Sequence, residues 1–332
     1  MRSDLINQDA SRSSRAMPES RRPSKPFIGI ALKVLSALAF TLMSAGVKTL
    51  SSVYPTGELV FFRSAFALVP LLVWLAWQGD LINAVRTTNL PGHLLRGLIG
   101  TCGMFAGFFA LSYLPLPDAV AIGYASPLIT VVLAALVLKE TVRAYRWTAV
   151  VIGFVGVLIM LMPHLDASAL ARGLSAGPVL GAVFALFAAF CAAGATIQVR
   201  RLTQTEKTGA IVLYFSLLTT MLGLATIVLG WRLPGPAEVG LLVLTGILGG
   251  VGQILLTESY RYADTSLLAP FEYTTMIWAL LTGWFLFAQL PQTTVVVGGV
   301  IVSAAGVFVV WRERQLELIR VKEVEVASQR PT

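Results

Sequence analysis

Long apolar runs separated by short polar breaks dominate this sequence. A helix needs roughly 20 mostly apolar residues to cross a bilayer. Breaks at Pro, Gly or charged clusters leave ten such runs, at residues 28–50, 58–78, 92–113, 117–138, 145–162, 175–199, 209–230, 236–259, 265–287 and 292–311. Because lipid cannot hydrogen-bond an exposed backbone, the sequence predicts an all-α integral membrane protein with ten transmembrane helices.

Charged residues are few and lie mainly outside these runs. Only 13% of the 332 residues are charged, against about 25% in a typical soluble protein. The positive charges are scattered between apolar runs instead of forming the basic surface that nucleic acid requires. The expected partners are therefore the lipid bilayer and a small-molecule solute, not nucleic acid. We expect residues 1–26 to be a disordered basic tail and residues 312–332 to be a charged tail.

The distribution of Lys and Arg predicts the orientation. Of the 25 basic residues, 19 lie in the termini and alternate loops of one side, two lie on the other side, and four lie in or at the edges of spans. Cytoplasmic loops carry the excess of positive charge. Both termini are therefore expected in the cytoplasm. An even number of spans likewise places the two termini on the same side of the membrane.

The two halves of the chain repeat at an offset near 150 residues. Ala39-Phe40 corresponds to Ala189-Phe190, Ser112-Tyr113 to Ser259-Tyr260, and Tyr124 to Tyr273. A unit of five spans is odd, so the second copy inserts upside down, an arrangement common in secondary carriers. We expect one repeat over residues 27–162 and a second over residues 175–311.

The residue pattern over about residues 30–311 resembles the EamA-domain branch of the drug/metabolite transporter superfamily. The stretches that carry the resemblance are residues 58–64 (ELVFFRS), 93–97 (HLLRG), 124–127 (YASP) running to 139–140, 153–157 (GFVGV), and 269–273 (APFEY) running to 289–291. The first half also resembles carriers for S-adenosylmethionine and riboflavin. This resemblance implies ten helices and carriage of a small organic solute across a bacterial inner membrane. Gln289 departs from the pattern, because the family commonly has a Glu there, equivalent to Glu140.

Glu272 is the strongest candidate for a functional residue. It lies about seven residues into its span, roughly 10 Å deep at 1.5 Å per residue. A short carboxylate at that depth must face a cavity or a partner, and ionisable groups inside membranes often mark substrate or proton sites. The alternative is a structural buried hydrogen bond.

Three further polar residues are candidates for the substrate site. Arg63 could bind a carboxylate or phosphate with its planar fork, or extend to the interface. Gln253 and Glu258 lie five residues apart and could line one wall. Glu258 could instead pair with Arg261.

Aromatic residues supply the remaining candidates. Tyr124 and Tyr273 occupy corresponding positions of the two repeats, and Trp278 follows in the same span as Tyr273. Aromatic walls suit a planar or cationic solute, although packing is the alternative for all three. Pro127 and Pro270 are expected to break backbone hydrogen bonds early in their spans.

The pattern favours a secondary transporter working by alternating access, with proton coupling as an option. An intramembrane enzyme and a channel remain as alternatives. The two histidines, His93 and His164, are expected on opposite sides of the membrane, so no paired-His metal site or Ser-His-Asp triad can form within a monomer. We expect no cofactor, no metal and no catalytic residue. The oligomeric state stays open between monomer and homodimer.

Overall fold

The computed structural model describes residues 26–139, 142–164, 177–263 and 265–328, and within those ranges the protein is helical with short connections and no strand. The sequence-predicted tail before residue 26 and Glu140 lie outside the described residues. The long helices are α2 (Pro26–Leu50), α3 (Thr56–Trp77), α5 (Leu90–Tyr113), α8 (Ala144–Leu161), α10 (Gly177–Leu202), α11 (Thr208–Ala225), α12 (Pro236–Tyr262) and α15 (Thr293–Ser328). Shorter elements are α4 (Leu81–Val85), η1 (Met162–His164) and η3 (Thr226–Leu229).

Nine helical stretches in the described ranges are long and apolar enough to cross a membrane. They match nine of the ten expected spans within a few residues. Their outer faces expose large apolar side chains such as Leu98, Val151 and Phe190, which lipid can cover. The chain is therefore an all-α, multi-pass membrane protein, while the count of ten and the orientation stay predictions.

The remaining expected span, residues 265–287, is not one continuous helix. It consists of α13 (Thr265–Leu268), the 3₁₀ turn η4 (Ala269–Tyr273) and α14 (Thr274–Phe287). Proline removes a backbone donor and its ring collides with the carbonyl four residues earlier. Pro270 accounts for the interruption, and α14 alone has only 14 residues.

A similar break divides the expected span 117–138. There α6 (Leu116–Gly123) gives way to α7 (Ala125–Val137) at Tyr124. Pro127 cannot donate to the carbonyl of Gly123, which is the last residue of α6. Both breaks predicted from proline are present, and they fall beside Tyr124 and Tyr273, which occupy corresponding positions of the two halves.

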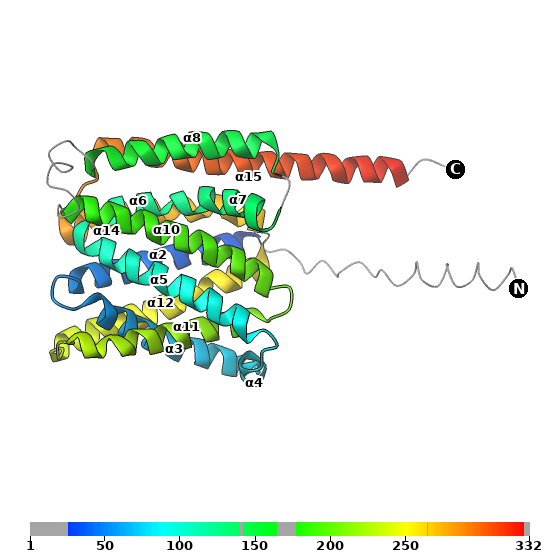
Figure 1. Ribbon diagram of the computed structural model, residues 1–332. Coiled ribbons are helices and arrows are strands. Elements are labelled where there is room, and N and C mark those ends of the chain that lie inside the picture. The colour runs from blue at the N-terminus through cyan, green and yellow to red at the C-terminus, as the bar shows by residue number, and fades with distance from the viewer. Residues whose placement is uncertain (1–25, 140–141, 165–176, 264, 329–332) are drawn as a thin grey trace, which may run out of the picture.

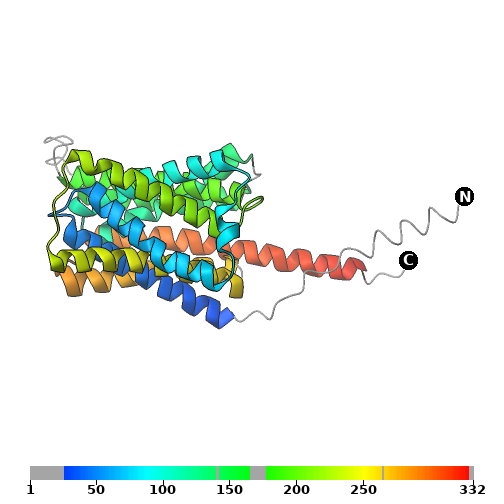
Figure 2. The same ribbon diagram turned by 90° about the horizontal axis from the view of Figure 1, so that it is seen from below.

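The helices run side by side along one bundle axis (Figure 1). Helix α2 packs most extensively on α12, α5 on α10, and α8 on α15. The start of α2 and the projecting carboxyl-terminal part of α15 lie at the same end of the bundle, which we call the proximal end (Figures 1 and 2). The opposite end is the distal end. Helix α15 continues past the expected boundary at residue 311 as one helix.

Small residues allow the central helices to approach closely. A Cβ atom on Gly103 of α5 would lie 2.9 Å from the Cβ of Cys191 on α10. A Cβ on Gly250 of α12 would lie 2.7 Å from the carbonyl oxygen of Ala67 on α3. Glycine-rich stretches therefore serve here as helix-packing surfaces, as is common in membranes.

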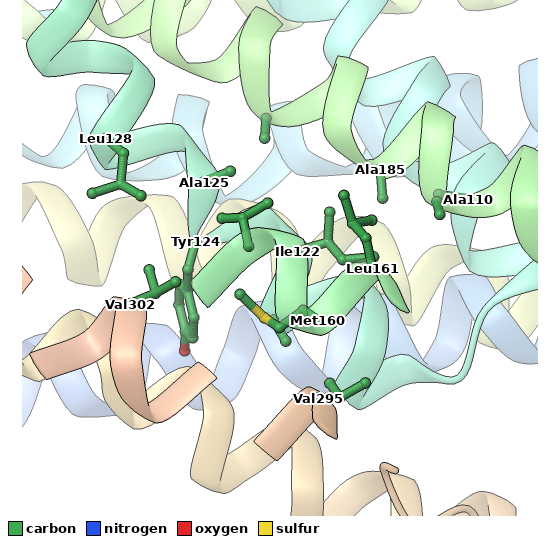
Figure 3. Packing of buried hydrophobic residues seen from close by; sticks show 14 of the residues in the cluster. Ala110, Ile122, Tyr124, Ala125, Leu128, Met160, Leu161, Ala185, Val295 and Val302 are labelled. Atoms are coloured by element: carbon green, nitrogen blue, oxygen red, sulfur yellow. The ribbon is translucent and has the colours of Figure 1, made fainter. Parts of the chain in front are cut away.

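One apolar cluster lies between α6, α7, α8, α10 and α15. It contains Ile122, Ala125, Met160 and Val302, all at most 2% exposed. Tyr124 lies at the edge of this cluster beside Val302 (Figure 3). The cluster thus packs α6 and α7, on both sides of the break at Tyr124, against α8, α10 and α15.

Candidate functional site

A cavity with two adjoining lobes lies at the centre of the bundle. The first lobe, of about 780 Å³, we call the arginine lobe. It is lined by Arg63, Arg96, Met104, Phe215, Gln253 and Thr257, among others. The second, of about 720 Å³, we call the ion-pair lobe; its lining includes Lys33, Tyr124, Thr130, Arg146, Glu272 and Glu313. Thr196, Leu256 and Tyr260 line both lobes. Each lobe is within the size range of small-molecule sites.

The cavity faces the proximal end. Thr203, in the connection after α10, and Thr208, the first residue of α11, are exposed and line the arginine lobe. At the distal end, by contrast, polar side chains are buried between the helices. Glu58 is fully buried, and its Oε2 accepts a hydrogen bond from the backbone N–H of Arg232 at 3.1 Å. The exposed part of the cavity lining thus includes residues at the proximal end, while the distal end holds buried polar contacts.

Asp118 and His164 form a second buried contact at the distal end. The Nε2 atom of His164 lies 3.2 Å from Oδ2 of Asp118. Lys48 also lies there and donates to the carbonyl oxygens of Leu111 and Leu114, at 3.1 and 2.5 Å. Lys48 thereby satisfies carbonyl groups at the end of α5, a helix-capping contact.

Glu272 pairs with a lysine inside the ion-pair lobe. The Nζ atom of Lys33 on α2 donates to its Oε2 at 2.8 Å. The side chain of Lys33 is only 6% exposed, whereas that of Glu272 is 56% exposed. The carboxylate thus faces the cavity and also has a buried partner. Its depth in the span had predicted either a cavity or a partner, and both are present.

The two tyrosines contact each other at the helix breaks. Their ring centroids lie 5.1 Å apart with the rings inclined by 67°. The hydroxyl group of Tyr124 makes a short hydrogen bond with Oγ1 of Thr275 and donates to the carbonyl oxygen of Tyr273 at 3.4 Å. Tyr124 lines the ion-pair lobe, whereas the hydroxyl of Tyr273 lies against Gly306 of α15. Tyr273 therefore supports the site from outside the lining.

Arg63 and Arg96 both line the arginine lobe. Arg63 is 8% exposed, and its Nε lies 3.4 Å from Sδ of Met43. The guanidinium group of Arg96 stacks over the ring of Phe215, with Cζ 4.2 Å from the ring centroid. The lobe therefore presents two cationic groups, one from α3 and one from α5.

The structure separates the other candidates. Gln253 lines the arginine lobe with Arg63. Glu258 accepts a hydrogen bond from Gln78 at 3.3 Å and lines a separate hollow at the proximal end. Trp278 lines neither lobe, and its Nε1 is buried without a hydrogen-bond partner among the described residues.

Sequence reasoning missed two cavity residues, Lys33 and Arg96. Both were counted among the basic residues within or at the edges of spans. The available signal was the cost of a charge inside an apolar run, the same signal that singled out Glu272 and Arg63. No local pattern could match Lys33 with a carboxylate 239 residues away.

Comparisons with known proteins agree with a membrane carrier. The model of the EamA-like transporter family matches residues 27–162 and 179–312. The pseudopaline exporter CntI of Pseudomonas aeruginosa is 30% identical over 279 residues, covering 83% of this chain and 94% of that protein. An S-adenosylmethionine uptake transporter of Rickettsia prowazekii is 27% identical and covers 86% of this chain and 94% of its own.

A riboflavin transporter of Rhizobium johnstonii is 29% identical over 298 residues, covering 89% of this chain and 95% of that protein. A solved crystal structure, 18% identical, matches with a TM-score of 0.61 and covers 87% of this chain and 98% of the other, which supports the fold. These similarities are to transporters and not to enzymes, in agreement with the expectation drawn from the sequence.

Proposed function

Since this chain belongs to the EamA-like transporter family and is a multi-pass inner-membrane carrier of small metabolites, we propose that it works by alternating access through the two-lobed cavity. The observation that carries the proposal is the Lys33–Glu272 pair, which lies in the cavity wall beside a broken helix. Ionisable groups and interrupted helices mark transport sites in membrane carriers.

The proposed state is open to the cytoplasm. The excess of Lys and Arg assigns the proximal end to the cytoplasmic side. The exposed lining residues Thr203 and Thr208 lie at that end, while Glu58 and Asp118 are buried at the other. Opening to the outside then requires the distal contacts to separate and the proximal ends of the helices to close.

Pseudo-symmetry between the two halves supports the inverted repeat that such rocking uses. The pairing of α2 with α12 corresponds to that of α10 with α5. The break at Tyr124 corresponds to the break at Tyr273. In addition, Lys139 and Ala288, about 150 residues apart, both adopt left-handed backbone conformations, with φ of 53° and 51°.

We propose that Glu272 couples solute binding to this conformational change. Protonating the carboxylate, or pairing it with a cationic group of the solute, removes the partner of Lys33. A buried ammonium that loses its partner is costly, so the packing of α2 against η4 and α14 becomes less favourable. Either event would bias the equilibrium between the two open states.

Untargeted metabolite profiling tests the proposal. Cells overproducing the wild type are compared with cells overproducing Glu272→Gln at matched protein levels, and both cells and medium are analysed. Glu238→Gln, an exposed substitution in the first turn of α12, serves as the control.

We expect at least one known solute to redistribute between cells and medium with the wild type and Glu238→Gln but not with Glu272→Gln. Redistribution at wild-type levels with Glu272→Gln would remove this carboxylate from the mechanism. A new compound that appears without redistribution would indicate chemistry in the membrane and contradict the carrier proposal.

A further inference from the structure

We infer that the arginine lobe is an oxyanion site, in which Arg63 and Arg96 together hold a carboxylate or phosphate group of the transported solute. The inference rests on the proposed function, because it assigns a chemical class to the cargo of the same cavity. The family match and the relatives do not assign a ligand to either arginine. Arg96 is a site residue that the sequence pattern alone did not single out.

Arg63 is a buried cation that lacks an anionic partner among the described residues. Its Nε contacts the thioether of Met43, and sulfur is a weak acceptor. A Cβ on Gly249 would lie 3.0 Å from this Nε, so glycine leaves the guanidinium the space it occupies. The remaining donors of the fork are available to a ligand in the lobe.

Arg96 has the same lack of an anionic partner. Its Nε and Nη1 atoms are buried and have no hydrogen-bond partner in the described chain. The guanidinium group lies over the ring of Phe215, and a Cβ on Gly100 would collide with Nη1. Phe215 also lines a small cleft with Arg63, so both cations lie about one aromatic wall.

The lining of the arginine lobe is unbalanced in charge. It contains both arginines and, among the described residues, no aspartate or glutamate. The two like charges repel each other across the lobe. Buried charges normally have partners, because removing an ion from water is strongly unfavourable. An anionic ligand supplies the missing charge, and the planar donors of arginine match carboxylate and phosphate oxygens.

The ion-pair lobe has a different balance. There Lys33 pairs with Glu272, and Arg146 pairs with Glu313 at 2.6 Å. Arg200 also lines this lobe, and it too has an interaction partner. The cations without an anionic partner among the described residues, Arg63 and Arg96, line the arginine lobe, which shares the wall residues Thr196 and Tyr260 with the ion-pair lobe. A solute with its anionic group in the arginine lobe could extend its remaining part past this wall towards Glu272.

The first test is anion binding by the purified full-length protein in lipid nanodiscs. Thermal unfolding is followed in sodium succinate, sodium phosphate and sodium chloride at equal ionic strength. The variants are Arg96→Gln, Arg63→Gln and Arg96→Lys, with Arg86→Gln, an exposed arginine outside the cavity, as the matched control.

We expect succinate or phosphate to raise the midpoint of the wild type and of Arg86→Gln above the chloride value, as binding to the folded state requires. The apparent affinity should fall about tenfold to a hundredfold in Arg96→Gln, since a hydrogen bond to a charged group is lost, and less in Arg96→Lys. In chloride, Arg96→Gln should unfold at or above the wild-type temperature, because an unpaired buried cation has been removed.

Equal stabilisation of wild type and Arg96→Gln would show only a general salt effect and would overturn the inference, as would no stabilisation of the wild type. A lower midpoint of Arg96→Gln in chloride would indicate a structural role instead. If Arg63→Gln does not fold, the Arg96 variants decide the question alone.

The second test uses the solute found by profiling. We expect this solute to carry a carboxylate or phosphate group, and its transport to fall in Arg96→Gln. A transported solute without an anionic group would overturn the inference and leave the proposed function intact. Arginine-dependent anion binding without transport of any solute would support the anion site and contradict the proposed transport function.

Discussion

The ammonium group of Lys33, near the start of α2, lies 2.8 Å from the carboxylate of Glu272 in the 3₁₀ turn that interrupts the ninth expected span. The contact joins the first and second halves of the chain in the wall of the cavity. Because Lys33 is almost completely buried and Glu272 is half exposed, solvent reaches the pair from the carboxylate side. The pair is therefore a structural contact whose carboxylate is exposed in the ion-pair lobe.

Removing either charge should slow transport strongly without unfolding the protein. Glu272→Gln keeps an acceptor for Lys33, and Lys33→Met removes the buried charge, so both variants should fold. Transport in proteoliposomes should fall at least about tenfold, the equivalent of one charge-assisted hydrogen bond.

The double variant Lys33→Met/Glu272→Gln separates two interpretations of the pair. If the charges act as a unit, the double variant should transport no more slowly than either single variant. Multiplicative losses would contradict this coupling and would indicate independent roles.

The hydroxyl groups of Tyr124 and Thr275 should stabilise the contact between the two helix breaks. Tyr124→Phe and Thr275→Val should each lower the free energy of unfolding by about 1 kcal/mol. The loss in the double variant should be smaller than the sum, as measured by thermal unfolding in nanodiscs. Strict additivity would mean that the short hydrogen bond between the hydroxyls does not contribute.

Glu206 should make the stability of the folded protein decrease as the pH falls through the acidic range. It lies in the connection between α10 and α11, and its Oε1 accepts hydrogen bonds from Thr87, from the backbone and hydroxyl of Thr88, and from the Asn89 backbone, at 2.9–3.0 Å. Burial opposes ionisation, but these bonds outweigh it and lower the pKa of Glu206 from 4.5 to about 2. The carboxylate thereby satisfies free donors at the start of α5.

A lowered pKa in the folded state stabilises the protein above the unfolded value, and the contribution disappears as pH falls from about 4.5 to about 2. The thermal midpoint of the wild type should therefore fall more steeply than that of Glu206→Gln as the pH is lowered from about 5 to about 3, a range that spans the ordinary glutamate pKa of 4.5. Glu238→Gln should keep the wild-type slope. Parallel curves for wild type and Glu206→Gln would exclude this role.

Replacing Ala288 with glycine should make the folded protein more stable. It ends α14 with φ of 51°, and the N–H groups of Ala288 and Gln289 bond back to the carbonyls of Trp284 and Gly283. A left-handed conformation costs a residue with a Cβ about 1–2 kcal/mol, and glycine's greater freedom in the unfolded chain offsets part of the gain.

Ala288→Gly should thus raise the free energy of unfolding by about 0.5–1 kcal/mol. Ala279→Gly, in the buried interior of the same helix, should instead lower it by about 1 kcal/mol. Thermal unfolding of both variants in nanodiscs checks the signs, and destabilisation by Ala288→Gly would contradict the argument.

The sequence by itself determined the membrane-spanning segments, the positions of the two proline breaks and the residues whose charge is costly in a bilayer. These features depend on local chemistry. A run of about 20 apolar residues must satisfy its backbone as a helix, and Pro127 and Pro270 remove donors wherever the helices pack. Glu272 and Arg63 stood out because each interrupts an apolar run.

Only the tertiary structure decided which charges meet. In membrane helices both the packed and the lipid-facing sides are apolar, so periodicity does not indicate which face turns inward. Hence the sequence could not predict that Lys33 pairs with Glu272, that Arg96 lines the same lobe as Arg63, or that Glu258 lies outside the cavity. Those relationships depend on how α2, α3, α5 and α12 rotate and pack against each other, which is set by close contacts between helices far apart in the chain.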